Sequence, residues 1–268
     1  MNSLIYTDQM GRKIVLEQQP KRIVSLVPSQ TELLFDLGLD EEVVGITRFC
    51  IHPHHQFKAK TRVGGTKQLY LDRIRALKPD LIIANKEENN KEQILELAND
   101  FPVWISDIID LTDALKMIES IGQLVQREAE AITLAREIAI AFTQLQPQPL
   151  AALPSAVYVI WQNPWMVAAS DTFIHNMLPY AGFRNYFADQ QRYPEINLSD
   201  LENRPPDVIL LSSEPFPFKQ KHQAALQKQF LNTTIVLADG ELFSWYGSRL
   251  LHAAAYFRNL RAKFSIYQ

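Results

Sequence analysis

Two segments of this chain, separated by close to half its length, repeat one pattern. Residues 76–88 read ALKPDLIIANKEE, and residues 203–215 read NRPPDVILLSSEP. Each has a Pro-Asp pair, four apolar residues and a polar segment that reaches an acid. A short apolar run bounded by turn residues predicts a buried strand. The repeat therefore predicts two similar α/β lobes with a cleft between them, and a ligand at the carboxyl ends of the strands.

Composition agrees with two folded lobes and excludes several classes of protein. The 268 residues suffice for two domains, and 47% are hydrophobic, which argues against disorder. The net charge of −3, without an arginine-rich run, gives no reason to expect a nucleic-acid partner. A single cysteine, Cys50, excludes an internal disulfide framework. No apolar stretch is long enough to predict a transmembrane segment.

Apolar runs alternate with helical patterns along the whole chain. This alternation predicts an α/β fold of two similar lobes with mostly parallel sheets. Residues 127–145 contain no Gly or Pro and predict a helix about 28 Å long, which could join the two lobes. We therefore expect an N-terminal α/β lobe at 1–125, an inter-lobe backbone helix at 126–150 and a C-terminal α/β lobe at 151–268.

Three blocks of the sequence resemble a known family. They are RIVSLVPSQTELLFDLGLDEEVVGIT, VGGTKQLYLDRIRALKPDLII and the long mid-chain helix. Together they resemble the helical-backbone (class III) periplasmic substrate-binding proteins of ATP-driven importers, which are receptors for cobalamin and iron–siderophores and are related to haem and metal receptors. The resemblance extends from Lys21 to Phe257. Residues 212–219, SSEPFPFK, and the region of Trp245 and Tyr246 are most similar to the cobalamin-binding branch.

The resemblance implies a function and its partners. It implies a monomer that binds a small-molecule metal chelate, performs no catalysis and docks to a membrane permease. The docking acids, which pair with permease arginines, correspond to Asp72 and Glu214, although the family more often has Glu at the first position. The N-terminal residues lack a signal-peptide pattern. We therefore expect a periplasmic protein if an export signal was removed or lies outside this sequence, and a cytoplasmic protein otherwise.

Two loops are candidates for the turns that line the ligand. Pro28 and Ser29 follow the first strand, where a helix dipole points at the ligand. Alternatively, Pro28 only ends the strand and Ser29 only caps the helix, with Glu32 completing a capping box. In VGGTK (63–67), Gly65 and Thr66 would let the backbone approach the ligand. A nucleotide-binding loop is a weaker alternative there, because the P-loop spacing is missing.

Aromatic residues form the second group of candidate ligand contacts. A corrin or haem is a broad, mainly apolar plate, and aromatic faces offer large contact areas at low entropic cost. Arg249 could bind a ligand amide or carboxylate, or could form only a surface ion pair. For Trp161, which ends a predicted strand, a place in the core is as well supported as a place in the cleft. The aromatic candidates at or after strand ends are Phe49, Trp161, Trp165, Trp245 and Tyr246.

The segment FCIHPHH (49–55) combines a thiol with imidazoles, which suggests a soft-metal site. Its alternating spacing, however, directs the side chains to different sides of a loop. We therefore predict neither a resident metal nor a cofactor. The alternative is that His52, or Cys50, is a ligand to the metal of the bound chelate.

Four functions follow, in order of support. The first is the substrate-binding component of an importer for a corrinoid, cobalamin or a similar metal chelate. The second is an iron–siderophore or haem receptor, which the scarcity of cations in the predicted lining disfavours. The third is a cytosolic chelatase-like enzyme that uses a His of FCIHPHH with Glu87 or Glu88. The fourth is a cytosolic corrinoid-binding relative that has lost transport. The sequence contains no nucleophile elbow, HExxH or dinucleotide fingerprint.

Overall fold

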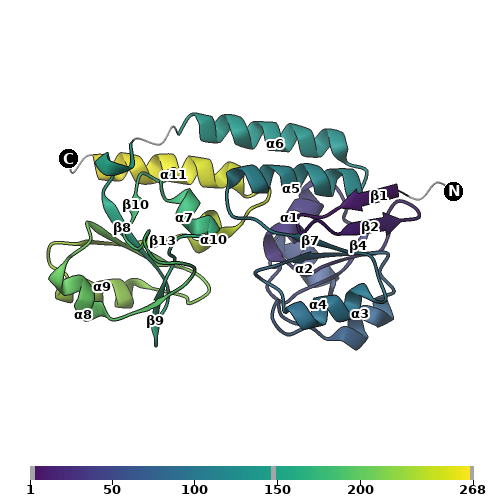
Figure 1. Ribbon diagram of the computed structural model, residues 1–268, viewed down its shortest axis with the longest axis horizontal. Coiled ribbons are helices and arrows are strands. Elements are labelled where there is room, and N and C mark those ends of the chain that lie inside the picture. Colours follow the sequence, from purple (N-terminus) through teal and green to yellow (C-terminus); the bar gives the residue numbers. More distant parts are fainter. Residues whose placement is uncertain (1–3, 146–148, 266–268) are drawn as a thin grey trace. The chain divides into compact units, whose positions relative to one another are not determined.

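The computed structural model describes residues 4–145 and 149–265. Contacts divide the chain into two compact units. Unit 1 comprises the chain up to Ile108, Thr112–Ala139 and Tyr246–Arg249, and unit 2 comprises Ile109–Leu111, Ile140–Trp245 and the chain from Leu250 onward. Each unit is an α/β structure built on its own sheet (Figure 1).

Unit 1 is built on a parallel sheet with strand order β5-β4-β3-β6-β7 among the described residues. The strands are β3 (Ile23–Ser25), β4 (Val43–Ile46), β5 (Thr61–Arg62), β6 (Leu81–Asn85) and β7 (Val103–Ser106). An antiparallel hairpin, β1 (Leu4–Thr7) and β2 (Lys13–Leu16), precedes them. The helices are α1 (Pro28–Asp36), α2 (His54–Ala59), α3 (Leu71–Leu77), α4 (Lys91–Ala98) and α5 (Leu111–Leu124).

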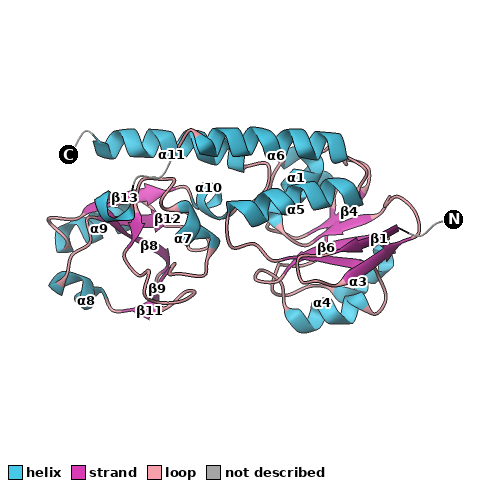
Figure 2. Ribbon diagram, turned by 45° about the horizontal axis from the view of Figure 1, so that its top comes forward, coloured by secondary structure: helices cyan, strands magenta, loops and turns pink. Residues whose placement is uncertain are grey.

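The central strands of unit 1 are buried on both faces, because helices cover the sheet on both sides. Figure 2 shows α3 and α4 on one face and α1 and α5 on the other. Every residue of β3, β6 and β7 is buried, as expected for a covered parallel sheet. Successive strand residues point to opposite faces. One hydrophobic cluster thus contains Val24, Ile82, Ala84, Val103 and Ile105 with Ile74, Ile94 and Leu97 from α3 and α4.

Unit 2 has a mixed sheet with strand order β11-β9-β8-β12-β13, and β10 pairs with β8. Strands β8, β12, β13 and β10 are parallel, whereas β9 and β11 run antiparallel at one edge. The strands are β8 (Ser155–Trp161), β9 (Trp165–Val167), β10 (Arg184–Asn185), β11 (Glu195–Ile196), β12 (Val208–Ser212) and β13 (Thr234–Ala238). The helices are η1 (Leu150–Ala152), α7 (Phe173–Met177), α8 (Leu198–Asn203), α9 (Gln220–Gln229), α10 (Gly240–Ser244) and α11 (Leu250–Ser265).

Alternate residues of β8 pack into different layers of unit 2. Val157 and Val159 belong to the hydrophobic cluster that includes Leu201 of α8 and Leu226 of α9. Tyr158, between them, packs against Phe243 of α10 with ring centroids 4.9 Å apart. Helices therefore cover both faces of this sheet as well, and the predicted fold class, α/β with two mostly parallel sheets, is confirmed.

Helix α6 (Glu128–Thr143) starts in unit 1 and ends in unit 2, with the division after Ala139. Its buried residues, Ala131, Ala135, Ile138 and Phe142, recur every three or four positions and form one apolar stripe. The predicted boundaries at 125 and 151 give this helix a segment of its own. The contacts instead share it between the units and add Tyr246–Arg249 to the first unit.

The repeated Pro-Asp corners have the same structural role in both units. Asp80 precedes β6, and its carboxylate accepts hydrogen bonds from the backbone N–H groups of Lys21 and Arg22, both 2.8 Å long, just before β3. Asp207 precedes β12 and accepts from the backbone N–H of Ser155, 2.7 Å away, at the start of β8. Each aspartate thus joins the starts of two neighbouring parallel strands.

Among the described residues, no helix is both long and apolar enough to cross a bilayer.

Candidate functional site

The carboxyl edge of the first sheet is held by a network of buried amide side chains. Asn89 Nδ2 donates to the carbonyl oxygens of Leu26, after β3, at 3.2 Å and of Thr66, after β5, at 3.1 Å. Asn85 Oδ1 accepts from the backbone N–H groups of Glu87 and Glu88 at 2.8 and 2.9 Å. These bonds tie together the three loops that follow β3, β5 and β6 of the same sheet. The predicted candidates in these loops therefore lie along one edge of the sheet.

Phe49 and Gly65 meet at this edge, next to Arg48. Phe49 is 47% exposed, and the Arg48 guanidinium carbon lies 4.9 Å from the centre of its ring. A Cβ on Gly65 would lie 3.1 Å from Phe49 Cε2 and 3.4 Å from Arg48 Nε. A side chain at this position would therefore push the Phe49 ring aside by a few tenths of an ångström. The sequence analysis selected Phe49 and Gly65 but missed Arg48.

Pro28 and Ser29 are buried in the first turn of α1, so neither is an open lining residue of unit 1. The helix begins after Val27, with Pro28 at its first position and no side-chain cap. The predicted Ser29 cap and its capping box with Glu32 are therefore wrong, because proline at the first helical position sets the helix start two residues earlier. A Cβ on Gly247 would lie 2.6 Å from the Ser29 carbonyl oxygen, so Gly247 packs directly on this turn.

Tyr246 is a buried residue of unit 1 and contacts the loop after β6. It is only 6% exposed, and its hydroxyl donates a 2.6 Å hydrogen bond to Glu88 Oε1. Burial, together with the negative charge of Glu88, raises the pKa of Tyr246 well above its ordinary value. The phenol therefore remains protonated and acts as a fixed donor to the carboxylate. This geometry gives Tyr246 a supporting role at the edge of the sheet.

Arg249 forms a bidentate ion pair with Glu32 on α1. Its Nε and Nη2 donate to the two carboxylate oxygens at 2.8 and 2.5 Å. The side chains are only 14% and 13% exposed. Arg249 therefore forms an ion pair, as the second alternative predicted, but the pair is mostly buried and not on the surface. The guanidinium already has a matched carboxylate partner, so it holds the Tyr246–Arg249 segment on unit 1.

An aromatic cluster lies at the carboxyl end of β8 in unit 2. Trp161 ends β8, is 38% exposed and meets the edge of Phe216 at a centroid distance of 5.7 Å. Trp165, which begins β9, stacks on Phe218 at 6.0 Å with an interplanar angle of 11°. The Phe216 and Phe218 rings are 4.6 Å apart. We call Trp161, Trp165, Phe216 and Phe218 the aromatic cluster. Trp161 is thus a partly exposed residue and not part of the core, and its contact with a ligand stays a prediction.

His222 of α9 borders the aromatic cluster. Its ring centroid lies 5.5 Å from those of both Phe216 and Phe218. Nδ1 accepts a 2.9 Å hydrogen bond from the backbone N–H of Lys219. Burial, followed by the charges of Lys221 and Lys219, lowers the pKa of His222. Because Nδ1 accepts this bond, the neutral ring carries its proton on Nε2, which is then a hydrogen-bond donor.

Trp245 and Glu214 are bound to each other inside unit 2. Trp245 is 6% exposed, and its Nε1 donates to Glu214 Oε1 at 2.9 Å. Ser244 Oγ donates to the same oxygen at 2.8 Å. Burial raises the pKa of Glu214, the charges of Glu241 and Asp239 add to this, and the two hydrogen bonds oppose it. The expectation of an open Trp245 is thus wrong, because the side chain is buried and its N–H is bonded within unit 2, whereas its contact with a ligand stays a prediction.

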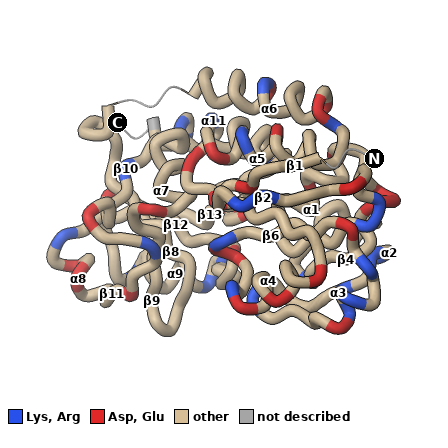
Figure 3. Tube along the Cα trace, turned by 45° about the vertical axis from the view of Figure 1, so that its right-hand side comes forward, with Lys and Arg blue, Asp and Glu red and all other residues tan. Residues whose placement is uncertain are grey.

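The two predicted docking acids lie in different surroundings. Asp72 is at the second position of α3, and its side chain is fully exposed, with Oδ1 3.6 Å from Arg75 Nη1. Figure 3 shows basic and acidic residues interspersed along α3 and α4. Glu214, in contrast, is half-buried and accepts two internal hydrogen bonds. Only Asp72 presents a carboxylate that a partner could reach without rearrangement.

The FCIHPHH segment does not gather its side chains. Cys50 is fully buried, and its sulfur lies 3.1 Å from the hydroxyls of both Thr31 and Thr47. Burial raises the pKa of the Cys50 thiol to about 11, so it is protonated at neutral pH. His54 stacks on Phe57 within α2. In the described part of the chain, no three His, Cys, Asp or Glu side chains are grouped so that they could hold a metal ion.

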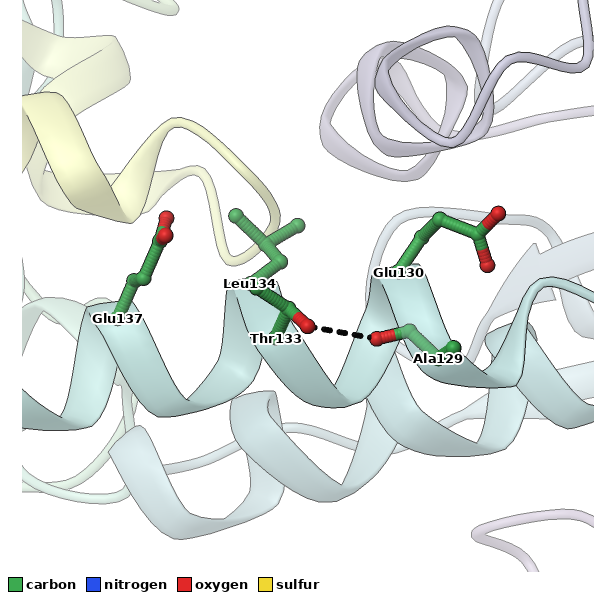
Figure 4. Close-up of a pocket in the computed structure, with 5 residues that line it drawn as sticks. All are labelled: Ala129, Glu130, Thr133, Leu134 and Glu137. Atoms are coloured by element: carbon green, nitrogen blue, oxygen red, sulfur yellow. Dashed lines mark hydrogen bonds between the residues drawn. The ribbon is translucent and has the colours of Figure 1, made fainter.

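A surface hollow on α6 is a separate feature from these edges. It is lined by Ala129, Glu130, Thr133, Leu134 and Glu137 (Figure 4). All five belong to one helix, and the Thr133 hydroxyl donates back to the Ala129 carbonyl at 2.8 Å. The hollow contains neither an aromatic side chain nor a cation, and none of the predicted ligand contacts lines it. It offers no recognition chemistry for a metal chelate.

The candidates that sequence reasoning missed are Arg48, Phe216, Phe218 and His222. A signal for Phe216 and Phe218 was present, because FPF follows a predicted strand and its alternate residues lie on one side of an extended chain. The reversal from Trp161 to Trp165 was signalled by Asn163-Pro164, a turn dipeptide. His222 had no signal of its own, since its place depends on how α9 packs.

The sequence profile of the periplasmic binding protein family matches residues 23–237. A vitamin B12-binding protein of Pectobacterium carotovorum is 25% identical over 240 residues, which cover 88% of this chain and 86% of that protein. An uncharacterized ABC transporter substrate-binding lipoprotein of Bacillus subtilis is 26% identical over 212 residues, which cover 76% of this chain and 67% of that protein.

Solved structures share the fold. The periplasmic vitamin B12 binding protein of Vibrio cholerae superimposes with a TM-score of 0.75 at 22% identity, covering 93% of this chain and 99% of that one. A periplasmic heme-binding protein in complex with two hemes gives a TM-score of 0.77 at 22% identity, covering 91% and 98%. At these identities the likeness concerns the fold alone, whereas the profile spans most of the sequence. The chain therefore belongs to the periplasmic binding protein family, as the resemblance in its sequence predicted.

Proposed function

We propose that the protein binds a corrinoid, cobalamin or a close relative, and delivers it to the permease of an ATP-driven importer. The observation that carries this proposal is the aromatic cluster at the carboxyl end of β8, together with the exposed Phe49 at the carboxyl end of β4. Such surfaces suit a broad ring with apolar faces. The vitamin B12-binding relatives support the same ligand class.

The small number of accessible guanidinium groups supports a corrinoid over the other ligand classes. Ferric siderophores and haem carry several acidic oxygens or two propionates, and their recognition favours several guanidinium groups. At the described edges, Arg249 is paired with Glu32, and Lys67 Nζ donates to the Glu87 carbonyl at 2.5 Å. A corrinoid, whose ring substituents are mostly neutral amides, needs fewer cations.

The same residues support binding without catalysis. In the chelatase-like alternative, Glu88 would take a proton from a tetrapyrrole, but its Oε1 already accepts the Tyr246 hydroxyl. The histidines of FCIHPHH form no metal-binding group with other described residues. The family consists of binding proteins, and we propose that this chain too acts by binding alone.

Docking to the permease is the second part of the proposal. Family membership implies a permease partner and a small-molecule ligand. We propose Asp72 as the docking acid of unit 1, because its fully exposed carboxylate can reach an arginine of the permease. For Glu214 to act in the same way, the carboxylate has to release Ser244 and Trp245. The proposal also requires the protein to meet its ligand outside the cytoplasmic membrane.

The test is a calorimetric titration of the purified protein with cyanocobalamin, followed in parallel by tryptophan fluorescence. Haem and a ferric hydroxamate siderophore are titrated under the same conditions. We expect saturable binding of one cobalamin per chain. Binding of haem or the siderophore without cobalamin would change the ligand class, and binding of none would refute the receptor function.

A variant pair connects the binding to the aromatic cluster. Trp161→Ala removes an exposed ring at the carboxyl end of β8, and we expect it to weaken cobalamin binding by about tenfold or more. The matched control is Tyr186→Ala. Tyr186 lies in the same unit, but its backbone N–H binds the Ala156 carbonyl near the start of β8, at the opposite end of the strand. If both variants lose the same cobalamin affinity, the aromatic cluster is not the ligand-binding surface.

A further inference from the structure

We infer that Arg48 is a specificity-determining residue that binds the single anionic group of the ligand, the phosphodiester of a cobalamin-type corrinoid. This inference rests on the proposed corrinoid-binding function and adds to it. It assigns the recognition of the ligand's negative charge to unit 1 and to one side chain. Phe49, beneath the guanidinium, would support the apolar part of the ligand.

Arg48 differs from three arginines of unit 1 that each form an ion pair. Arg12 pairs with Asp8, Arg75 with Glu96 and Asp100, and Arg249 with Glu32. Within residues 4–145 and 149–265, Arg48 forms no ion pair, although its side chain is exposed at the carboxyl edge of the sheet. Its contacts are the ring of Phe49 and, through its backbone N–H, the Gly64 carbonyl at 2.8 Å.

The stacking leaves the hydrogen-bonding edge of Arg48 available. All N–H donors of a guanidinium lie in its plane, so an aromatic ring that covers one face does not occupy them. The guanidinium carbon is 4.9 Å from the centre of the Phe49 ring. Gly65 lies beside both side chains, since a Cβ there would be 3.1 Å from Phe49 Cε2 and 3.4 Å from Arg48 Nε and Nη2. The absence of a side chain at Gly65 leaves space next to the guanidinium, whose side chain is exposed.

The backbone beneath Arg48 is fixed as well. Gly64 has φ +114°, and a Cβ there would lie 2.5 Å from the Gln68 carbonyl oxygen. The Gly65 N–H donates to that same carbonyl at 2.8 Å. Glycine is required at this turn, because other residues rarely adopt this conformation. A fixed platform lowers the entropic cost of holding a long side chain in one geometry.

The charge of the site matches one phosphodiester. A guanidinium binds two phosphate oxygens through parallel hydrogen bonds, which is the geometry that favours arginine over lysine. Cobalamin carries one such group, in the loop that links the corrin ring to its nucleotide base, and its other ring substituents are amides. Nearby Lys67 donates to the Glu87 carbonyl. The edge thus offers one accessible guanidinium for one anion.

The test compares two ligands and two variants by calorimetry. Cyanocobalamin carries the phosphodiester, and dicyanocobinamide lacks it together with the nucleotide base. Arg48→Met keeps an unbranched chain but loses the charge. Arg73→Met is the matched control, because Arg73 also stacks on an exposed aromatic residue, Tyr70, with the guanidinium carbon 4.9 Å from the ring centre. Unlike Arg48, Arg73 uses its guanidinium to bond the Arg62 carbonyl at 2.7 Å.

We expect Arg48→Met to weaken cyanocobalamin binding by between about tenfold and a hundredfold, the range for hydrogen bonds to charged groups. Dicyanocobinamide should bind wild type and Arg48→Met equally, and Arg73→Met should leave both affinities unchanged. Cobalamin affinity of the wild type should fall as salt is raised, and Arg48→Met should lose this dependence. Arg48→Lys should restore the salt dependence but only part of the affinity.

The measurements distinguish a failure of the proposed function from a failure of the inference about Arg48. If the wild type binds neither corrinoid, the proposed function itself is wrong. If the wild type binds cobalamin and Arg48→Met loses affinity for both corrinoids equally, Arg48 only supports the site and the inference is overturned. Unchanged cobalamin affinity in Arg48→Met overturns it too, while the corrinoid function stands. If Arg48→Met does not fold, the test rests on Arg48→Lys. Cobalamin affinity equal to wild type at every salt concentration in Arg48→Lys would contradict bidentate binding of the phosphodiester.

Discussion

The Tyr246 hydroxyl donates a 2.6 Å hydrogen bond to Glu88 Oε1, although the two residues are 158 positions apart in the sequence. Tyr246 belongs to a four-residue segment, Tyr246–Arg249, that returns to unit 1 late in the chain. Three side chains of this segment bond to unit 1. Besides the Tyr246 bond, Ser248 donates to Asp36, and Arg249 pairs with Glu32. The segment therefore completes unit 1 through polar contacts to α1 and to the loop after β6.

Removing the Tyr246 hydroxyl should destabilise the protein. In Tyr246→Phe, the Glu88 carboxylate loses a buried donor, and we expect the free energy of unfolding to fall by about 1–3 kcal/mol. Urea denaturation followed by circular dichroism measures this change. Tyr70→Phe is the control, because Tyr70 is 51% exposed and its hydroxyl can bond water. An equal change in both variants would contradict the structural role of the Tyr246–Glu88 bond.

Removing one partner of the Arg249–Glu32 pair should lower the free energy of unfolding, and removing both should lower it by less than the sum of the two single changes. Either Arg249→Met or Glu32→Leu leaves an unpaired, mostly buried charge, so each should lower the free energy of unfolding by about 3 kcal/mol. The double variant should lose less than the sum, since it leaves no unpaired charge. A double-mutant cycle in urea measures the coupling energy. Strict additivity would mean that the pair makes no net contribution.

The raised pKa of Glu214 predicts a pH dependence of stability. The folded protein holds the Glu214 proton to a higher pH than the unfolded chain does. This group's contribution to stability therefore falls as pH rises from the ordinary glutamate pKa through the raised one. Glu214→Gln keeps an acceptor for Trp245 and Ser244 but carries no charge. We expect a higher free energy of unfolding than wild type at pH 7, and a flatter fall as pH rises above the ordinary glutamate pKa.

The measurement for Glu214 is urea denaturation at a series of pH values. Asp72→Asn provides the control, because the Asp72 side chain is fully exposed and its substitution should leave the pH profile unchanged. If Glu214→Gln lowers stability at every pH, the carboxylate is a better partner for Trp245 and Ser244 than its raised pKa implies.

Gly64 and Gly11 form a matched pair for backbone strain. Both have positive φ, +114° and +76°, but a Cβ on Gly64 would lie 2.5 Å from a backbone oxygen, whereas Gly11 has nothing within 4 Å. Gly11→Ala should cost about 1 kcal/mol, the strain of the left-handed region alone. Gly64→Ala should cost at least about 2 kcal/mol more, because backbone atoms have to move. Thermal and urea unfolding of the two variants check the difference.

Asp72→Lys should separate docking from ligand binding. The substitution reverses an exposed charge on α3, so we expect cobalamin affinity and stability close to wild type. Binding to the cognate permease, measured by surface plasmon resonance, should weaken because a like charge now faces arginine. Lys91→Glu, on α4, is a charge-reversal control. Unchanged permease binding by Asp72→Lys would remove Asp72 from the interface.

The fold was predictable because its main signals are local. The Pro-Asp corners at Asp80 and Asp207 and the apolar runs after them identified equivalent strands in the two units, and both aspartates bond the start of a neighbouring strand. The short edge strands β9, β10 and β11 were missed. They have two or three residues each and are defined by pairing with β8 and one another, not by an apolar run of their own.

The candidate site was harder to predict, because burial is a property of tertiary packing. Trp245, Tyr246 and Arg249 follow the last strand of the sheet in unit 2, so a position beside the ligand was a sound expectation. Nothing local in the sequence indicated that Glu214, Glu88 and Glu32 would bind them. Phe49 and Trp161, by contrast, are exposed where strands end, as their positions indicated.

The late return of the chain to unit 1 affects how the protein is made. During synthesis, β3 to β7 and α1 to α5 leave the ribosome long before Tyr246, so unit 1 forms with Glu88 and Glu32 still without these two partners. Its last contacts are made only when the chain is more than nine-tenths complete. For the same reason, no single cut yields either unit whole. A nascent or truncated chain is therefore a weaker unit 1 that lacks these late contacts, a form that chaperones and proteases can distinguish from the finished protein.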